Sequence, residues 1–159
     1  DLILGSTASG SAIGTLVERA TRFTLLLHLP DGHTALAVQE AIVAKMDGLP
    51  AILRKTLTWD QGKEMANHIE IAAATDLDIY FCDPHSPWQR GTNENTNGLL
   101  RQYFAKGTDL SVFPADYLDY VATKLNRRPR QTLGWKTPAE ALDELLSNPF
   151  KPPAVASTA

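Results

Sequence analysis

Glu94 lies between two arginines on a predicted helix, within the segment from Cys82 to Arg101. Arg90, Glu94, Asn97 and Arg101 fall at positions i, i+4, i+7 and i+11, which puts them on one helix face. A carboxylate flanked on its own face by two cations is unusual for a solvent-facing helix, and it suits a metal site that also contacts phosphate groups. A solvated helix position is the alternative for Glu94 taken alone, because charged side chains are mostly exposed.

The start of this helix has two possible positions. Ser86 is a suitable N-cap, Pro87 suits the first helical position, and Gln89 stands where a capping box has glutamine or glutamate. A glycine in the next turn leaves open a later start, at Thr92, which would place Arg90 in the preceding loop.

Two carboxylates upstream could share a metal ion with Glu94. Asp60 ends a predicted strand in the block from Leu57 to Glu64, and Asp1 opens the chain before another short strand. The 33 residues between Asp60 and Glu94 suffice for a helix, a strand and a loop. Magnesium prefers hard oxygen ligands, including a few carboxylates. Taken singly, Asp60 is better explained as a turn residue and Asp1 as a solvated chain-start residue.

The spacing of Asp60 and Glu94 and the blocks Thr58 to Glu64 and Ser86 to Asn95 resemble the catalytic core of DDE transposases, closest to the insertion sequence thirty (IS-thirty) family. The resemblance runs from Asp1 to about Leu146. It implies an integrase-type, ribonuclease-H-like core. Within that core it implies catalytic, metal-binding roles for Asp1, Asp60 and Glu94.

The same resemblance implies a function. Two Mg²⁺ ions, with Mn²⁺ as a substitute, would support hydrolysis of a phosphodiester at a transposon end and transfer of the freed strand to target DNA. The expected partners are double-stranded DNA, as transposon ends and as target, and further copies of the chain assembled on it. The family's N-terminal helix-turn-helix region has no counterpart here, so we expect a catalytic core, in the bacterial cytoplasm and associated with the nucleoid when active.

Two other functions stay open at this point. The chain could be a truncated, non-catalytic core that only binds DNA or other transposase subunits. It could also be a ribonuclease H or a junction resolvase, which share the chemistry, although the block from Ser86 to Arg101 makes these less suitable.

Composition sets broad limits. The 159 residues are 43% hydrophobic and 21% charged, as in one soluble globular domain. No apolar run approaches the roughly 20 residues needed to cross a bilayer, so no membrane contact is expected. The single cysteine, Cys82, excludes an internal disulfide and a cysteine zinc cluster, and it fits a reducing cytoplasm.

The clustering of positive charge along the chain favours DNA binding, although the net charge does not. The net charge of −3 argues against a dedicated DNA-binding module, because duplex binding depends largely on phosphate neutralisation. Asn126 to Arg130 is nevertheless a compact basic group, which could serve phosphate binding, the helix macrodipole or both. The predicted DNA contacts are Arg90, Asn97, Arg101, Arg127, Arg128, Arg130 and Lys136.

The elements that must position these residues follow from the sequence pattern. Three antiparallel strands are predicted over residues 1–4, 12–18 and 22–29, and two later strands over 53–59 and 78–81. Besides the Glu94 helix, helices are predicted over residues 33–46, 63–74, 114–125 and 137–146, the last with Thr137 and Glu140 as a capping box. Pattern alone gives an α/β fold with a mixed sheet. The resemblance narrows this to a ribonuclease-H-like mixed five-stranded sheet, with three antiparallel strands, then parallel strands, and helices on both faces.

The domain expected is an integrase-type catalytic core over residues 1–147, with a flexible C-terminal tail over 148–159. Two residues near Glu94 are ambiguous. His85 is better explained as a loop or capping residue than as a ligand, and Trp88 as core packing rather than a base-stacking residue.

Overall fold

The fold comes from a computed structural model, which describes residues 1–148. The strands are β1 (Leu2–Leu4), β2 (Ala12–Val17), β3 (Thr24–Leu29), β4 (Thr56–Trp59) and β5 (Asp78–Phe81). The helices are α1 (Ala35–Asp47), α2 (His68–Thr75), α3 (Gly91–Leu100), α4 (Ala115–Asn126) and α5 (Pro138–Ser147). Their types and order confirm the sequence prediction. Residues 149–159 of the predicted tail lie outside the described part of the chain.

The strands form two hydrogen-bonded sheets. β1, β2 and β3 pair antiparallel in that order, with Ile13 of β2 opposite Ile3 and His28, while β4 and β5 pair parallel. The prediction of one five-stranded sheet therefore needs a correction in this detail, because no ladder joins the two sheets within residues 1–148. β1 is only three residues long and so offers few backbone groups for a second partner.

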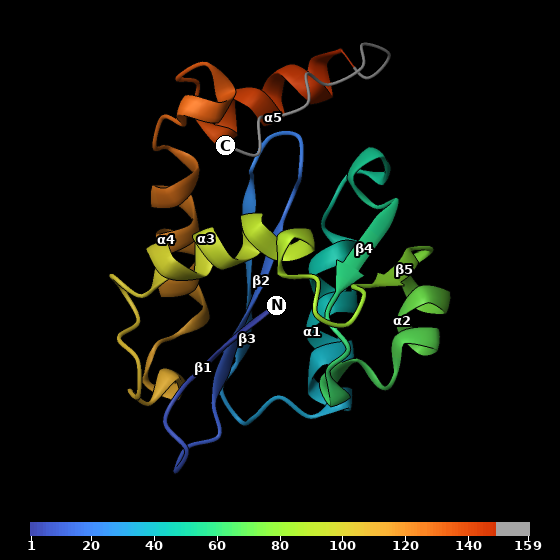
Figure 1. The fold of residues 1–159 in the computed structure, drawn as a ribbon, viewed down its shortest axis with the longest axis vertical. Coiled ribbons are helices and arrows are strands. Elements are labelled where there is room, and N and C mark those ends of the chain that lie inside the picture. Colours follow the sequence, from blue (N-terminus) through green and yellow to red (C-terminus); the bar gives the residue numbers. More distant parts are fainter. Residues whose placement is uncertain (149–159) are drawn as a thin grey trace.

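Alternating side chains give the three-stranded sheet two apolar faces. On β3, Leu27 and Leu29 belong to a core shared with α1 and α2, whereas Leu26 belongs to a second core with α3 and α4. Figure 1 shows α3 and α4 on one side of these strands and α1 on the other. Helices on both faces of the sheet are therefore confirmed. Within the described part of the chain, no helix is long and apolar enough to span a membrane.

α3 begins at neither of the two predicted starts, Pro87 and Thr92. A short 3₁₀ turn, Pro87–Arg90, precedes α3, which begins at Gly91. The predicted cap is wrong, since the Ser86 side chain makes no capping bond. Gln89 is turned to the loop instead, where its Oε1 accepts from Asp83 N at 2.8 Å and its Nε2 donates to Asp83 Oδ2 at 3.0 Å. The capping box of Thr137 and Glu140 is confirmed at α5.

A buried asparagine attaches α4 to the sheet. Thr24 N donates to Asn126 Oδ1 at 2.8 Å, and Asn126 Nδ2 donates to Thr24 O at 2.9 Å. The amide of Asn126 thus satisfies both polar groups of a buried strand residue, as a neighbouring strand would.

Replacing Asn126 with alanine is expected to lower the free energy of unfolding by about 2–4 kcal/mol, because each orphaned buried group costs about 1–3 kcal/mol. Urea denaturation measures the effect. Asn95→Ala, at an exposed position of α3, is the control and should stay within about 0.5 kcal/mol of wild type. A loss for Asn126→Ala no larger than that of the control would mean that water replaces both bonds.

Candidate active site

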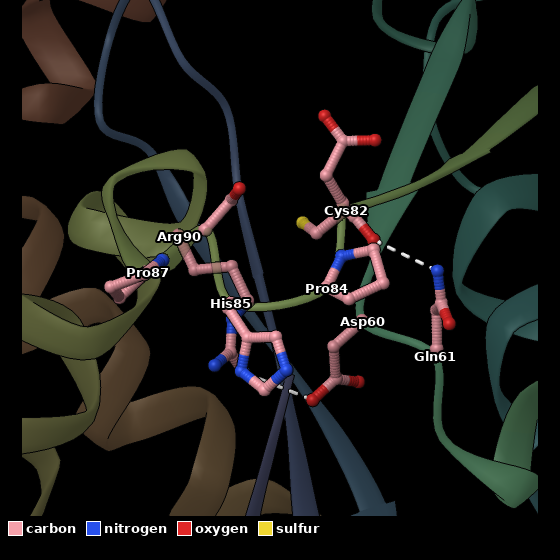
Figure 2. Close-up of a pocket in the computed structure, with 9 residues that line it drawn as sticks. Asp60, Gln61, Cys82, Pro84, His85, Pro87 and Arg90 are labelled. Atoms are coloured by element: carbon pink, nitrogen blue, oxygen red, sulfur yellow. Dashed lines mark hydrogen bonds and ion pairs between the residues drawn. The ribbon is translucent and has the colours of Figure 1, made fainter.

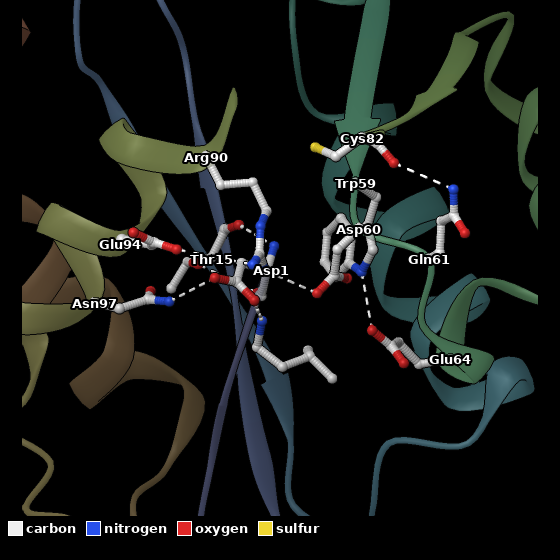
Figure 3. A network of polar contacts seen from close by, with 11 residues as sticks. Asp1, Thr15, Trp59, Asp60, Gln61, Glu64, Cys82, Arg90, Glu94 and Asn97 are labelled. Atoms are coloured by element: carbon white, nitrogen blue, oxygen red, sulfur yellow. Dashed lines mark hydrogen bonds and ion pairs between the residues drawn. The ribbon is translucent and has the colours of Figure 1, made fainter. Parts of the chain in front are cut away.

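Three chain segments bring the predicted carboxylates to one region (Figure 3). Asp60 directly follows β4, and Glu94 lies in the first turn of α3. Arg90 connects them, since its Nη1 lies 2.9 Å from Asp60 Oδ2 and its Nη2 lies 3.8 Å from Glu94 Oε1. Both carboxylates therefore face one guanidinium group. This cation was predicted as a phosphate contact, and here its partners are the two acids.

Asp1 is tied to the same helix by Asn97. Its Oδ2 accepts a hydrogen bond from Asn97 Nδ2 at 3.0 Å, and its Oδ1 accepts from Leu2 N at 2.8 Å. Asn97 lies one turn after Glu94 on α3, so this single helix orients two of the three predicted ligands. The Asn97 amide was predicted to contact DNA, and its Nδ2 is instead used within the site.

The backbone nitrogen of Asp1 is used inside the sheet, where it donates to Thr15 O at 3.1 Å. The guanidinium of Arg90 is the cation that pairs with the Asp60 carboxylate.

Two buried oxygens in this region have no hydrogen-bond partner in the described structure, Asp60 Oδ1 and Asn97 Oδ1. Orphaned buried acceptors are costly, and a bound cation would satisfy them. The donor set of Asp1, Asp60 and Glu94 consists of hard oxygens, so these residues fit a divalent ion in their chemistry. Within residues 1–148, however, no three acidic, histidine or cysteine side chains stand close enough together to hold one. The three-carboxylate site stays a prediction.

A fourth carboxylate, Glu64, was not singled out by the sequence analysis. The indole Nε1 of buried Trp59 donates to Glu64 Oε1 at 3.0 Å (Figure 3). Gly62 makes this possible, because a Cβ atom there would clash with the carboxylate of Glu64 in this position. The signal was present in the Asp60 block, where a glycine stands midway between Asp60 and Glu64.

A cavity of about 280 Å³ opens beside Asp60, lined by the loop of residues 82–87 together with Asp60, Gln61 and Arg90 (Figure 2). Gln61 Nε2 donates to Cys82 O at 3.2 Å, which joins the end of β4 to the end of β5. His85 is an exposed loop residue with a φ of 60°, as its loop assignment predicted. Trp88 is 76% exposed, so the prediction that it packs in the core is wrong.

The remaining residues predicted to contact DNA differ in the partners that their side chains have within the protein. Arg101 donates to Leu4 O at 3.3 Å, and Lys136 pairs with Glu144 at 2.8 Å. In the basic group after α4, Arg128 donates to the Tyr103 hydroxyl at 2.6 Å, and Arg130 donates to Leu125 O at 3.1 Å. Burial, with Arg128 nearby, lowers the pKa of Arg130. Arg127 is exposed and has no side-chain bond to any described residue.

The chain is similar in sequence to known transposases. The chain is 56% identical over 149 residues to the transposase of insertion sequence element IS1086 from Cupriavidus metallidurans, a match over 94% of this chain and 43% of that protein. It is 51% identical over 143 residues to transposase InsI of insertion sequence element IS30C from Escherichia coli, over 90% of this chain and 37% of that protein. The chain thus spans about two fifths of the length of these relatives. No family model matches the chain.

Solved structures match the fold. The catalytic core domain of BIV integrase superimposes with a TM-score of 0.66 and 18% identity, over 95% of each chain. A chain of the simian T-cell lymphotropic virus intasome, in complex with a PP2A regulatory subunit, gives a TM-score of 0.67 and 18% identity, over 88% of this chain and 51% of that one. The fold is therefore that of an integrase-type, ribonuclease-H-like catalytic core. The homologues of the chain are transposases of the IS30 family.

Proposed function

We propose that this chain is the catalytic core of a DDE transposase, which cleaves DNA strands at transposon ends and joins them to target DNA. The observation that carries the proposal is that Asp60, which directly follows β4, and Glu94, in α3, both contact the guanidinium of Arg90. Asp1 is held to the same helix by Asn97. Homology to transposases over 90–94% of the chain supports the same reaction class, a polynucleotidyl transfer that begins with phosphodiester hydrolysis.

Asp1, Asp60 and Glu94 are the residues that would hold two Mg²⁺ ions, or Mn²⁺ in their place. Such a pair lowers the pKa of the attacking water or 3′-hydroxyl and stabilises the leaving oxygen. The chain itself supplies orientation. Asn97 fixes the Asp1 carboxylate through one hydrogen bond, and α3 carries Glu94 at a constant offset from it. No protein nucleophile is required.

The proposed partner is double-stranded DNA, both transposon end and target, with further copies of the chain assembled on it. The intasome among the structural neighbours supports an oligomer of this kind. The proposed location is the bacterial cytoplasm, with association to the nucleoid during activity. The proposed backbone contacts are Arg90, Asn97, Arg101, Arg127, Arg128, Arg130 and Lys136. Arg127 is the most accessible of the basic group after α4.

Cleavage of a labelled duplex tests the proposal. A duplex carrying the terminal inverted repeat of a related insertion sequence should be nicked in Mg²⁺ or Mn²⁺ and remain intact with a chelator. An RNA:DNA hybrid should be a poor substrate, and preferential cleavage of the hybrid would point to a ribonuclease H. Binding of the duplex without metal-dependent nicking would favour the alternative, a non-catalytic core. The lack of a close three-carboxylate group among the described residues is the observation that keeps this alternative in view.

Replacing Arg127 and Arg128 together with alanine is expected to weaken duplex binding about equally for all sequences. It should also reduce the slope of log affinity against log salt by about two, because each phosphate contact contributes about 0.9. Fluorescence anisotropy at several salt concentrations measures both effects. The pair Lys45→Ala and Lys55→Ala removes the same charge from α1 and from the residue that precedes β4, and it is the control. An equal slope in wild type and the arginine variant would assign the basic group to helix-end electrostatics.

A further inference from the structure

The guanidinium of Arg90 lies between two of the three predicted metal-binding carboxylates. It contacts Asp60 through one nitrogen, at 2.9 Å, and Glu94 through another, at 3.8 Å. The planar fork of arginine can serve two carboxylates at once, whereas the ammonium group of lysine is a single point charge. The sequence put Arg90 on the polar face with Glu94, but it gave no indication that Asp60, 30 residues earlier, is its second partner.

We propose that Arg90 is the resident counter-ion of the carboxylate site, that divalent ions displace it from Asp60 and Glu94, and that the displaced guanidinium then becomes available to a DNA phosphate. This inference rests on the proposed function, because it assumes that the carboxylates bind ions.

Electrostatics explain why the site needs a resident cation. Asp1, Asp60, Glu64 and Glu94 bring four carboxylates into one region, and like charges in proximity repel one another. The Asp60 and Arg90 side chains are only 33% and 31% exposed, so water screens their attraction less than at an open surface. Without Arg90, Asp60 would be left partly buried and without a cationic partner.

The same contacts put Arg90 in competition with an ion for these two carboxylates. Arg90 pairs with Asp60 Oδ2, while Oδ1 is buried and has no hydrogen bond. An ion bound by both Asp60 and Glu94 would lie next to the guanidinium, and the repulsion between the two cations would drive the guanidinium out of the space between the carboxylates. Arg90 has room to leave, because it lies at the junction of the turn Pro87–Arg90 with α3 and lines the cavity beside Asp60.

Displacement couples the two ligands of the site. If ions release Arg90 for phosphate, then ions strengthen DNA binding, and DNA strengthens ion binding by the same factor. The charge of Arg90 is thus used twice, first to hold the carboxylates in the ion-free protein and then to hold DNA in the ion-loaded protein.

Mn²⁺ titration without DNA tests the displacement. Paramagnetic resonance of free Mn²⁺ gives the affinity of wild type, Arg90→Gln and the control Arg19→Gln, whose arginine is exposed in the turn between β2 and β3. We expect Arg90→Gln to bind Mn²⁺ about 5-fold or more tightly, a typical coupling factor. Arg19→Gln should stay within about twofold of wild type, because an exposed charge outside the site is largely screened. If Arg90→Gln does not unfold cooperatively, Arg90→Lys replaces it, with a smaller gain in affinity expected.

Duplex binding with and without Ca²⁺ supplies the second measurement. Ca²⁺ should strengthen DNA binding by wild type, and this gain should be several-fold smaller in Arg90→Gln than in wild type. Equal or weaker Mn²⁺ binding by the Arg90 variant would overturn the displacement and leave the proposed function intact. No saturable Mn²⁺ binding by either wild type or the variant would overturn the proposed function as well.

Discussion

Replacing Glu94 with glutamine is expected to reduce metal-dependent DNA cleavage by about 10²–10³-fold, the range found when one group that stabilises transition-state charge is removed. Glutamine keeps the size of the side chain but removes the negative charge that an ion would need as a ligand. DNA binding through the arginines should persist, because those contacts do not involve Glu94. A nicking assay in Mg²⁺ and Mn²⁺ measures the loss.

The Glu94→Gln variant should fold with nearly the stability of wild type. Glu94 is 49% exposed and its ion pair with Arg90 is long, at 3.8 Å, so its loss should change the free energy of unfolding by no more than about 0.5 kcal/mol. Glu70→Gln, at an exposed position of α2, is the matched control and should cleave like wild type. Full cleavage by Glu94→Gln would remove Glu94 from the active site and leave it a solvated helix residue.

Replacing Phe104 with alanine is expected to cost about 3–5 kcal/mol in the free energy of unfolding. Phe104 is fully buried in the core between the sheet and α4, where its ring meets the edges of Phe113 and Tyr117 at centroid distances of 5.1 and 5.9 Å. A domain of this size is stable by only about 5–15 kcal/mol, so the loss is a large share of the total.

Urea denaturation of Phe104→Ala measures that cost. Val112→Ala is the control, since Val112 is 68% exposed and its truncation should change stability by less than about 0.5 kcal/mol. A loss below about 1 kcal/mol for Phe104→Ala would mean that the neighbouring rings close the cavity.

Local signals predicted the fold well. The run of leucines in β3 fits a strand that is buried on both faces, and the structure shows Leu26 on one face and Leu27 on the other. The capping box at Thr137 depends on residues three apart, so it could be recognised directly. The bounds of β5 agree at both ends, since a short apolar strand there is followed at once by Cys82, Asp83 and Pro84.

The partners of the polar site residues could not be predicted in the same way. Asp60 and Arg90 are 30 residues apart, and Asp1 and Asn97 are 96 apart, so only the tertiary fold decides that they meet. The predicted capping box at Ser86 is absent for a local reason, because Gln89 bonds to Asp83 in the preceding loop instead. Sequence analysis named Asp1, Asp60 and Glu94 as candidate site residues, but it could not predict that Arg90 bonds to Asp60 or that Asn97 bonds to Asp1.

The hydrogen bonds between Asn126 and Thr24 also limit aggregation between separate copies of this chain. β3 is an outer strand of its sheet, and such edges can recruit a strand from another molecule. At Thr24 both outward backbone groups are already taken by the Asn126 amide, so no foreign strand can pair there. β5, at the edge of the other sheet, resists pairing differently, since it is only four residues long and begins with the charged Asp78. The β3 and β5 edges are thus protected against strand pairing with another molecule by unrelated means.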